Sequence, residues 1–155
     1  LILDEPFSGF DPINTNIIKE EILRMRKEGA NVIFSTHNMS SVEEICDNIA
    51  LLNKSEKIIE GSVKEIRNAY KSNVFEIEFR GNMIAFANAL WTNFELLEKT
   101  EDGNILKAKI KLLSGSTPNK LLENLLPYVE IVSFKEILPS MNDIFIKKVS
   151  EVIKN

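Results

Sequence analysis

Two carboxylates follow directly on a short apolar segment at the start of the sequence. Leu1, Ile2 and Leu3 precede Asp4 and Glu5. Such an apolar segment is typical of a short buried strand, and in an open α/β sheet ligands bind at the carboxyl ends of the strands. Two acids at such a strand end cost free energy unless a positive group meets them, and Mg²⁺ on nucleotide phosphates has the required chemistry. The sequence therefore indicates an acidic site for a metal-bound phosphate.

A second apolar segment, residues 31–36, ends at His37, the only histidine in the chain. Between the two segments, residues 13–28 place apolar side chains on one face of a predicted helix, namely Ile17, Ile18, Ile22 and Met25. A strand–helix–strand unit of this kind brings both carboxyl ends to the same edge of a parallel sheet. We therefore expect Asp4, Glu5 and His37 to converge.

Each pattern has a simpler interpretation when it is taken alone. An Asp-Glu-Pro segment can be an acidic turn, and a histidine after a strand is more often a surface or core residue. A metal site without nucleotide is a further option, but structural metal sites favour cysteine and several histidines. The occurrence of both patterns in one βαβ unit favours a site for a phosphate ligand.

The residue types, order and spacing resemble those of one family. Residues 1–12 resemble the Walker B strand and D-loop of ABC-transporter ATP-binding subunits, and residues 35–38 resemble the H-loop of that family. Phe10 is a departure, since leucine is more usual there. The resemblance covers roughly the first 70 residues directly. The segment 138–145 is similar to the end of the carboxyl-terminal domain found on many exporter-type subunits.

The resemblance implies a role for each site residue. Asp4 would hold Mg²⁺ through water, Glu5 would act as general base on the attacking water, and His37 would contact the γ-phosphate or that water. The D-loop would cross a dimer interface towards the opposite ATP and consists here of Ser8, Gly9 and Asp11. The implied cofactors are ATP and Mg²⁺. The implied partners are a second ATP-binding subunit and a transmembrane permease, with the subunit in the cytoplasm at the inner face of the membrane.

Two motifs of the family do not occur in this chain. There is no G-x-x-x-x-G-K-[ST] loop to hold phosphates and no Leu-Ser-Gly-Gly-Gln. Both precede the Asp-Glu strand in the family, and the chain begins at Leu1 inside a strand, so we expect a fragment without its amino-terminal part. The fragment alone is then expected to bind ATP weakly, to be inactive, and to expose apolar edges that favour self-association.

The pattern changes near residues 71–73, which predicts two domains, 1–72 and 73–155. The expected fold class is α/β for the first, a partial P-loop NTPase parallel sheet without its Walker A portion. The second is expected to be a ferredoxin-like βαββαβ domain, which includes a last helix over residues 141–153 capped by Ser140 and Asp143. A capping box at residues 40–43 predicts another helix start. Lysines at 107, 109 and 111 are expected to form a solvated face rather than an anion site.

The composition limits the classes of function. The chain has 155 residues, 44% hydrophobic and 27% charged, which is typical of a soluble globular protein. A net charge of −4 argues against a nucleic-acid partner. The single cysteine, Cys46, excludes an internal disulfide and is expected to lie in the core. The leading hypothesis is an exporter's ATP-hydrolysing subunit; a soluble ABC ATPase of DNA repair or translation, and a regulatory or dimerising module, are the alternatives.

Overall fold

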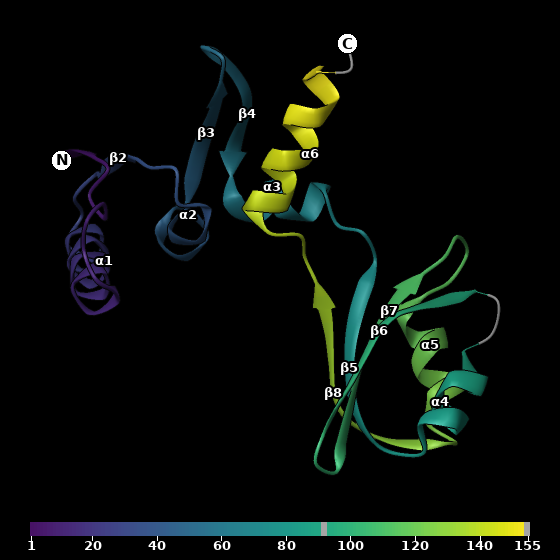
Figure 1. Ribbon diagram of the computed structural model, residues 1–155. Coiled ribbons are helices and arrows are strands. Elements are labelled where there is room, and N and C mark those ends of the chain that lie inside the picture. Colours follow the sequence, from purple (N-terminus) through teal and green to yellow (C-terminus); the bar gives the residue numbers. More distant parts are fainter. Residues whose placement is uncertain (91–92, 154–155) are drawn as a thin grey trace. The chain divides into compact units, whose positions relative to one another are not determined.

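A computed structural model describes residues 1–90 and 93–153 and divides the chain into two compact units (Figure 1). Unit 1 comprises Leu1–Ala69 together with the segment that begins at Ser140, and unit 2 comprises Tyr70–Pro139. The chain therefore passes from unit 1 to unit 2 after Ala69 and returns to unit 1 after Pro139.

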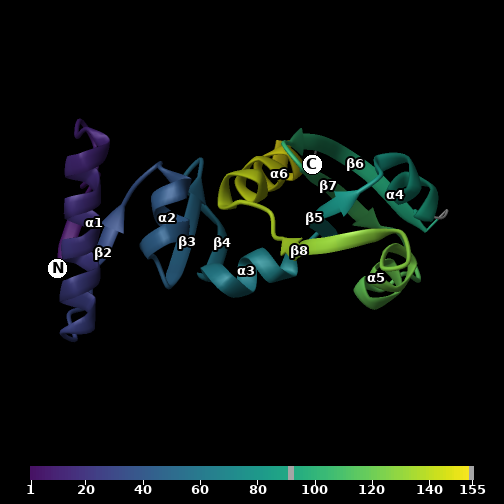
Figure 2. The ribbon, with the colours of Figure 1, turned by 90° about the horizontal axis from the view of Figure 1, so that it is seen from below.

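The first part of unit 1 is a βαβ arrangement. Strand β1 (Ile2–Asp4) and strand β2 (Ile33–Ser35) pair in parallel, with Asp4 opposite Ser35, and helix α1 (Pro12–Lys27) connects them. Figure 2 shows α1 beside β2. Successive side chains of a strand point to opposite faces, so one face of the pair packs on the helix. The packed residues are Leu3 and Phe34 with Phe7, Ile18 and Ile22.

Helix α1 spans Pro12–Lys27, one residue earlier at each end than the predicted range 13–28. The Asp11 carboxylate accepts from the amides of Ile13 and Asn14 at 2.9 and 3.0 Å, which satisfies two of the amides that a helix start leaves without partners. The buried stripe is narrower than expected, since Ile22 is buried but Ile17 is 57% exposed.

The remainder of unit 1 consists of a hairpin and three helices. The elements are α2 (Met39–Ile45), β3 (Asn48–Asn53), β4 (Glu56–Ser62), α3 (Val63–Ala69) and α6 (Met141–Ile153). Lys54 and Ser55 both have positive φ and form the two-residue turn between the antiparallel strands β3 and β4. Helix α6 contacts α2 and α3, and its Met141 and Ile144 are buried.

The capping residue of α2 differs from the sequence prediction. Asn38, not Ser40, caps the helix, because its side chain accepts from the Ser41 amide at 3.1 Å. Glu43 makes no capping box with Ser40. It accepts instead from the amide of Met141 at 2.6 Å.

Unit 2 has the βαββαβ order. Its elements are β5 (Val74–Gly81), α4 (Met83–Ala89), β6 (Phe94–Asp102), β7 (Ile105–Leu112), α5 (Pro118–Leu125) and β8 (Val129–Ile137). The four strands pair antiparallel in the order β6-β7-β5-β8, which is the ferredoxin-like arrangement. Both helices pack on one face of this sheet, as Figure 1 shows. Apolar residues that alternate along β5 form the core with them: Phe75, Ile77 and Phe79.

The last helix is placed differently from the expected second domain of residues 73–155. Helix α6 belongs to unit 1, where it contacts α2 and α3. Its start is capped as predicted, since the Asp143 amide donates to Ser140 Oγ at 3.1 Å and the Ser140 amide donates to Asp143 Oδ2 at 3.1 Å. An apolar stripe predicts that a helix is buried, but it does not say which unit buries it.

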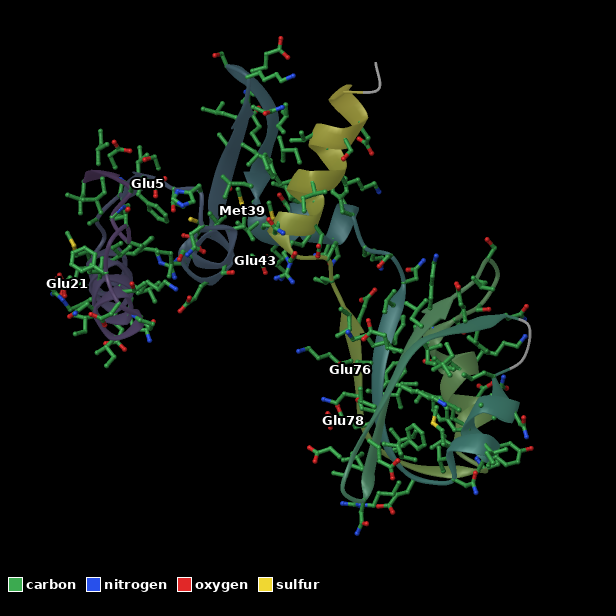
Figure 3. All side chains as sticks on the ribbon, in the orientation of Figure 1. Glu5, Glu21, Met39, Glu43, Glu76 and Glu78 are labelled. Carbon is green, nitrogen blue, oxygen red and sulfur yellow. The ribbon has the colours of Figure 1, made fainter. Side chains whose placement is uncertain are left out.

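The other face of the unit 2 sheet carries charges of alternating sign. Figure 3 shows Glu76 and Glu78 on the side of the sheet away from α4 and α5. Lys107 Nζ lies 2.7 Å from Glu78, and Lys109 Nζ lies 2.7 Å from Glu98. These contacts raise the pKa of both lysines, chiefly through the hydrogen bond to the carboxylate in each case. Because these lysines pair with neighbouring acids, this face of the sheet is not suited to binding an anion.

Candidate functional site

The candidate site lies where β1 and β2 end. The two strands are parallel and in register, so their carboxyl ends meet at one edge of the pair. The Glu5 amide donates to the Ser35 carbonyl oxygen at 3.1 Å, which extends the pairing by one residue. The backbone of Glu5 then turns with φ 44°, a left-handed conformation that a residue with a side chain rarely adopts. This turn ends β1 and places the Glu5 carboxylate beside the loop that follows β2.

The Glu5 carboxylate binds the His37 loop at several points. Its Oε1 atom lies 2.8 Å from Nδ1 of His37 and accepts from the His37 amide at 3.1 Å. The Thr36 hydroxyl lies 3.3 Å from Oε2. The structure therefore brings Glu5 and His37 into direct contact, as the parallel strands predict. Figure 3 labels Glu5 at this edge.

These contacts control the charge of Glu5. The hydrogen bond to the His37 side chain is the largest effect and lowers the pKa of Glu5 below its ordinary value of 4.5. The carboxylate is therefore ionised at neutral pH, and an ionised carboxylate only accepts hydrogen bonds. Nδ1 of His37 is then the protonated nitrogen of this contact. The second nitrogen, Nε2, donates only when the whole ring is protonated.

Asp4 lies at the same edge and accepts a hydrogen bond from the Ser35 hydroxyl. Its residue is exposed, so water can reach the carboxylate. Within the described residues, no group of three or more His, Cys, Asp and Glu side chains is arranged to hold a metal ion. A single exposed carboxylate suits an ion that keeps most of its water and takes its other ligands from phosphates, which is the usual coordination of Mg²⁺.

The predicted D-loop residues lie between the acids and α1. The amide of Ser8 donates to the Glu5 carbonyl oxygen at 3.1 Å, and Gly9 has φ 80° with open space where a Cβ would be. Asp11 caps α1. The hydrogen bond from the Asn14 amide is the largest cause that lowers the pKa of Asp11, and the bond from the Asn14 side chain is the next largest. All three predicted residues are exposed, and among the hydrogen bonds and ion pairs of the described residues none joins them to His37.

Three residues of the site lie in the predicted H-loop, residues 35–38, but the sequence assigned them no role of their own. Ser35 and Thr36 bind the two acids, and Asn38 connects the His37 loop to α2 because its amide donates to Thr36 Oγ1 at 3.1 Å. The sequence contained a signal for them, since hydroxyl and amide side chains directly after a strand commonly bind neighbouring backbone and cap the next helix.

Part of the chain matches a known protein family. The family described as "ATP-binding protein DrrA1-3-like, C-terminal domain" matches residues 61–149. This range includes all of unit 2, together with α3 and most of α6.

Curated proteins similar to this chain are ABC transporter ATP-binding proteins. An uncharacterised one from Bacillus subtilis, YhaQ, is 32% identical over 154 residues, 98% of this chain and 49% of that protein. Another from Alkalihalophilus pseudofirmus is 30% identical over 149 residues, 96% of this chain and 54% of that protein. A fluoroquinolones export ATP-binding protein of Mycobacterium tuberculosis is 33% identical over 82 residues, 53% of this chain and 27% of that protein. The chain thus spans about half the length of the first two relatives.

Among the residues that the structure describes, no helix has the length and apolar character needed to cross a membrane.

Proposed function

The chain belongs to the family of ABC transporter ATP-binding proteins, and from this we propose that it forms the carboxyl-terminal half of an ATP-hydrolysing subunit that powers a membrane transporter. The observation that carries the proposal is the contact between Glu5 and His37 at the edge where β1 and β2 end. An ionised carboxylate held against an imidazole is suited to activating a water molecule.

We propose that Glu5 is the general base for the attacking water. Its lowered pKa keeps it ionised at neutral pH, so its protonation state is correct for this role. The backbone turn at Glu5 and the bond from the His37 amide fix the direction of the carboxylate. A base held in place in this way reaches the reacting atoms without reorganisation.

Asp4 is proposed to hold Mg²⁺ through its water shell, and when bound this ion supplies positive charge that neutralises the phosphate oxygens of ATP. The exposed carboxylate and its single bond from Ser35 leave room for water molecules on the other oxygen. His37 is proposed to contact the γ-phosphate through Nε2. Because Nδ1 faces Glu5, this contact requires the protonated ring.

We propose that β1 and β2 belong to a larger parallel sheet of the P-loop NTPase type. Ile2 and Ile33 lie on the face of the pair away from α1 and are 81% and 65% exposed. Both faces of a parallel sheet are normally covered by other parts of the protein, so apolar side chains on either face are buried. The exposed apolar face supports the view that further sheet and helix of the same protein cover it.

The proposed partners follow from the family. A second ATP-binding subunit would close on the D-loop of Ser8, Gly9 and Asp11, and a transmembrane permease would receive the work of ATP hydrolysis, with the subunit in the cytoplasm at the membrane. Export is the proposed direction. The similarity over 82 residues to a protein named for fluoroquinolone export supports it. The test is whether the complete protein co-purifies with membranes rather than with ribosomes or DNA.

The 155-residue chain by itself is proposed to be inactive. In P-loop enzymes the backbone amides and lysine of the phosphate loop make the main contacts with ATP, and this sequence contains no such loop. Isothermal titration of this chain with Mg-ATP is expected to show no saturable heat. Saturable binding in the micromolar range would contradict this expectation.

The experiment that tests the proposed function is ATP hydrolysis by the complete protein. Glu5→Gln is expected to lower kcat by roughly 10²–10⁴-fold while Mg-ATP still binds, because the base is lost and the shape is kept. Glu28→Gln is the matched control, since Glu28 is an exposed acid that pairs with Arg24 on α1. If Glu5→Gln hydrolyses ATP as fast as Glu28→Gln does, the proposal is wrong.

A further inference from the structure

One carboxylate in unit 1 binds two segments that are distant in sequence. Oε1 of Glu43, on α2, accepts from the amide of Met141 at 2.6 Å, and Oε2 lies 3.2 Å from Nη1 of Arg67. The side chains of Glu43 and Arg67 are 22% and 28% exposed, so the ion pair is partly shielded from water. Figure 3 shows Glu43 near the start of α6.

The two bound segments are the two connections to unit 2. Arg67 lies on α3, just before the chain leaves unit 1 after Ala69. Met141 is the first residue of α6, just after the chain returns at Ser140. Glu43 therefore fixes the end of α3 and the start of α6 to the same helix.

The helix that carries Glu43 is also connected to the candidate site. Helix α2 begins directly after His37, and its cap, Asn38, binds both the Ser41 amide and Thr36. Thr36 in turn lies within hydrogen-bond distance of Glu5. Buried side chains pack α2 in place: Ser41, Val42 and Ile45. A short, well-packed helix of this kind moves as one body, so its two ends move together.

The neighbouring acid has a different partner. Glu44 pairs with Lys19 of α1 at 2.5 Å and is 54% exposed. Among the hydrogen bonds and ion pairs of the described residues, Glu44 has none with either connection to unit 2. The same helix therefore provides an adjacent, more exposed glutamate with a different partner.

We propose that Glu43 is a positioning residue for the reaction at Glu5 and His37. Glu43 attaches the end of α3 and the start of α6, which are the two connections to unit 2, to helix α2, and thereby holds the His37 loop in its place. This inference rests on the proposed function. The Glu43 carboxylate accepts from the first amide of α6, which is favourable because that end of a helix carries partial positive charge, and its other oxygen pairs with Arg67. Removal of the carboxylate takes away the ion pair with Arg67 and the acceptor at the start of α6, which loosens both connections at once.

The test compares Glu43→Ala with Glu44→Ala in the complete protein. Three quantities are measured: hydrogen exchange at the Met141 amide, kcat and KM for ATP, and the NMR signal of the His37 imidazole, identified by its absence in His37→Gln. For Glu43→Ala we expect exchange at Met141 to rise by on the order of tenfold or more. We expect kcat to fall by roughly threefold to tenfold with KM unchanged, and the His37 signal to shift. Glu44→Ala should match the wild type in all three.

Two results would overturn the proposal. The first is faster exchange at Met141 in Glu43→Ala with kcat and the His37 signal equal to those of Glu44→Ala. The carboxylate would then stabilise only the start of α6 and would not affect the His37 loop. The second is unchanged exchange at Met141. If Glu43→Ala does not fold, Glu43→Gln gives the comparison through kcat and the His37 signal alone, because it loses the ion pair with Arg67 while its amide oxygen can still accept from Met141.

The proposed function can fail separately. If His37→Gln and Glu5→Gln retain the kcat of the wild type, the catalytic assignment is wrong. The exchange rate at Met141 and the shift of the His37 signal do not depend on turnover, so they still decide whether Glu43 positions the His37 loop.

Discussion

Nδ1 of His37 lies 2.8 Å from Oε1 of Glu5, although 32 residues separate them in sequence. The contact exists because β1 and β2 are parallel and in register, so that Glu5 directly follows the end of β1 and His37 lies two residues beyond the end of β2. It is not a chance surface pair, since the His37 amide and the Thr36 hydroxyl approach the same carboxylate.

The contact between Glu5 and His37 should make stability depend on pH in a defined range. Because the pKa of Glu5 is lower in the folded state than its ordinary 4.5, the contribution is fully present above that value. It is lost as the pH falls through the lowered folded value. The free energy of unfolding of wild type minus that of Glu5→Gln should therefore be larger at about pH 6 than at about pH 3. A difference that is the same at both pH values would contradict the prediction.

Asp11 should stabilise α1 through its cap. Asp11→Ala removes the acceptor for the amides of Ile13 and Asn14 and is expected to lower the free energy of unfolding, and with it the urea midpoint. Asp11→Asn is the matched control, because asparagine caps helices about as well as aspartate does. Urea unfolding of the two variants measures the effect. If both variants lose the same free energy of unfolding, the charge of Asp11 stabilises α1 and its role as a capping acceptor does not.

Cys46 should react slowly in the folded chain. Burial is the largest cause that raises the pKa of its thiol, and the nearby charge of Asp47 raises it further. The thiolate is the reactive form, so little of it is present at neutral pH. Because the chain has a single cysteine, alkylation by iodoacetamide followed by mass spectrometry gives the rate directly. We expect a much lower rate in buffer than in urea, and equal rates would contradict the placement of Cys46 beside the apolar cluster of α1.

The contact between Glu5 and His37 could be predicted from the sequence because its signals are local. An apolar strand, a capped helix and a second apolar strand define a βαβ unit, and that unit alone brings Glu5 and His37 to one edge. The order of elements in unit 2 was likewise readable, since Phe75, Ile77 and Phe79 alternate with acids along β5.

What the sequence did not predict depends on contacts between distant segments. The stripe on α6 is apolar whichever unit buries it, and only the packing on α2 and α3 assigns it to unit 1. Glu43 has the spacing of a capping box with Ser40, but Asn38 caps the helix and Glu43 binds Met141, 98 residues away. Ile17 has the spacing of a buried residue but is exposed. Such partners are decided by tertiary structure, which local patterns do not contain.

The central claim is that the Glu5 and His37 pair faces the γ-phosphate of a magnesium-bound nucleotide. The most direct measurement follows the His37 imidazole by NMR in the complete protein, with the signal assigned through His37→Gln. Addition of Mg²⁺ with a non-hydrolysable ATP analogue should shift the signal, and Mg-ADP, which lacks the γ-phosphate, should shift it much less. An imidazole signal that does not respond to the ATP analogue at saturating concentration, or that responds equally to ADP, would contradict the claim.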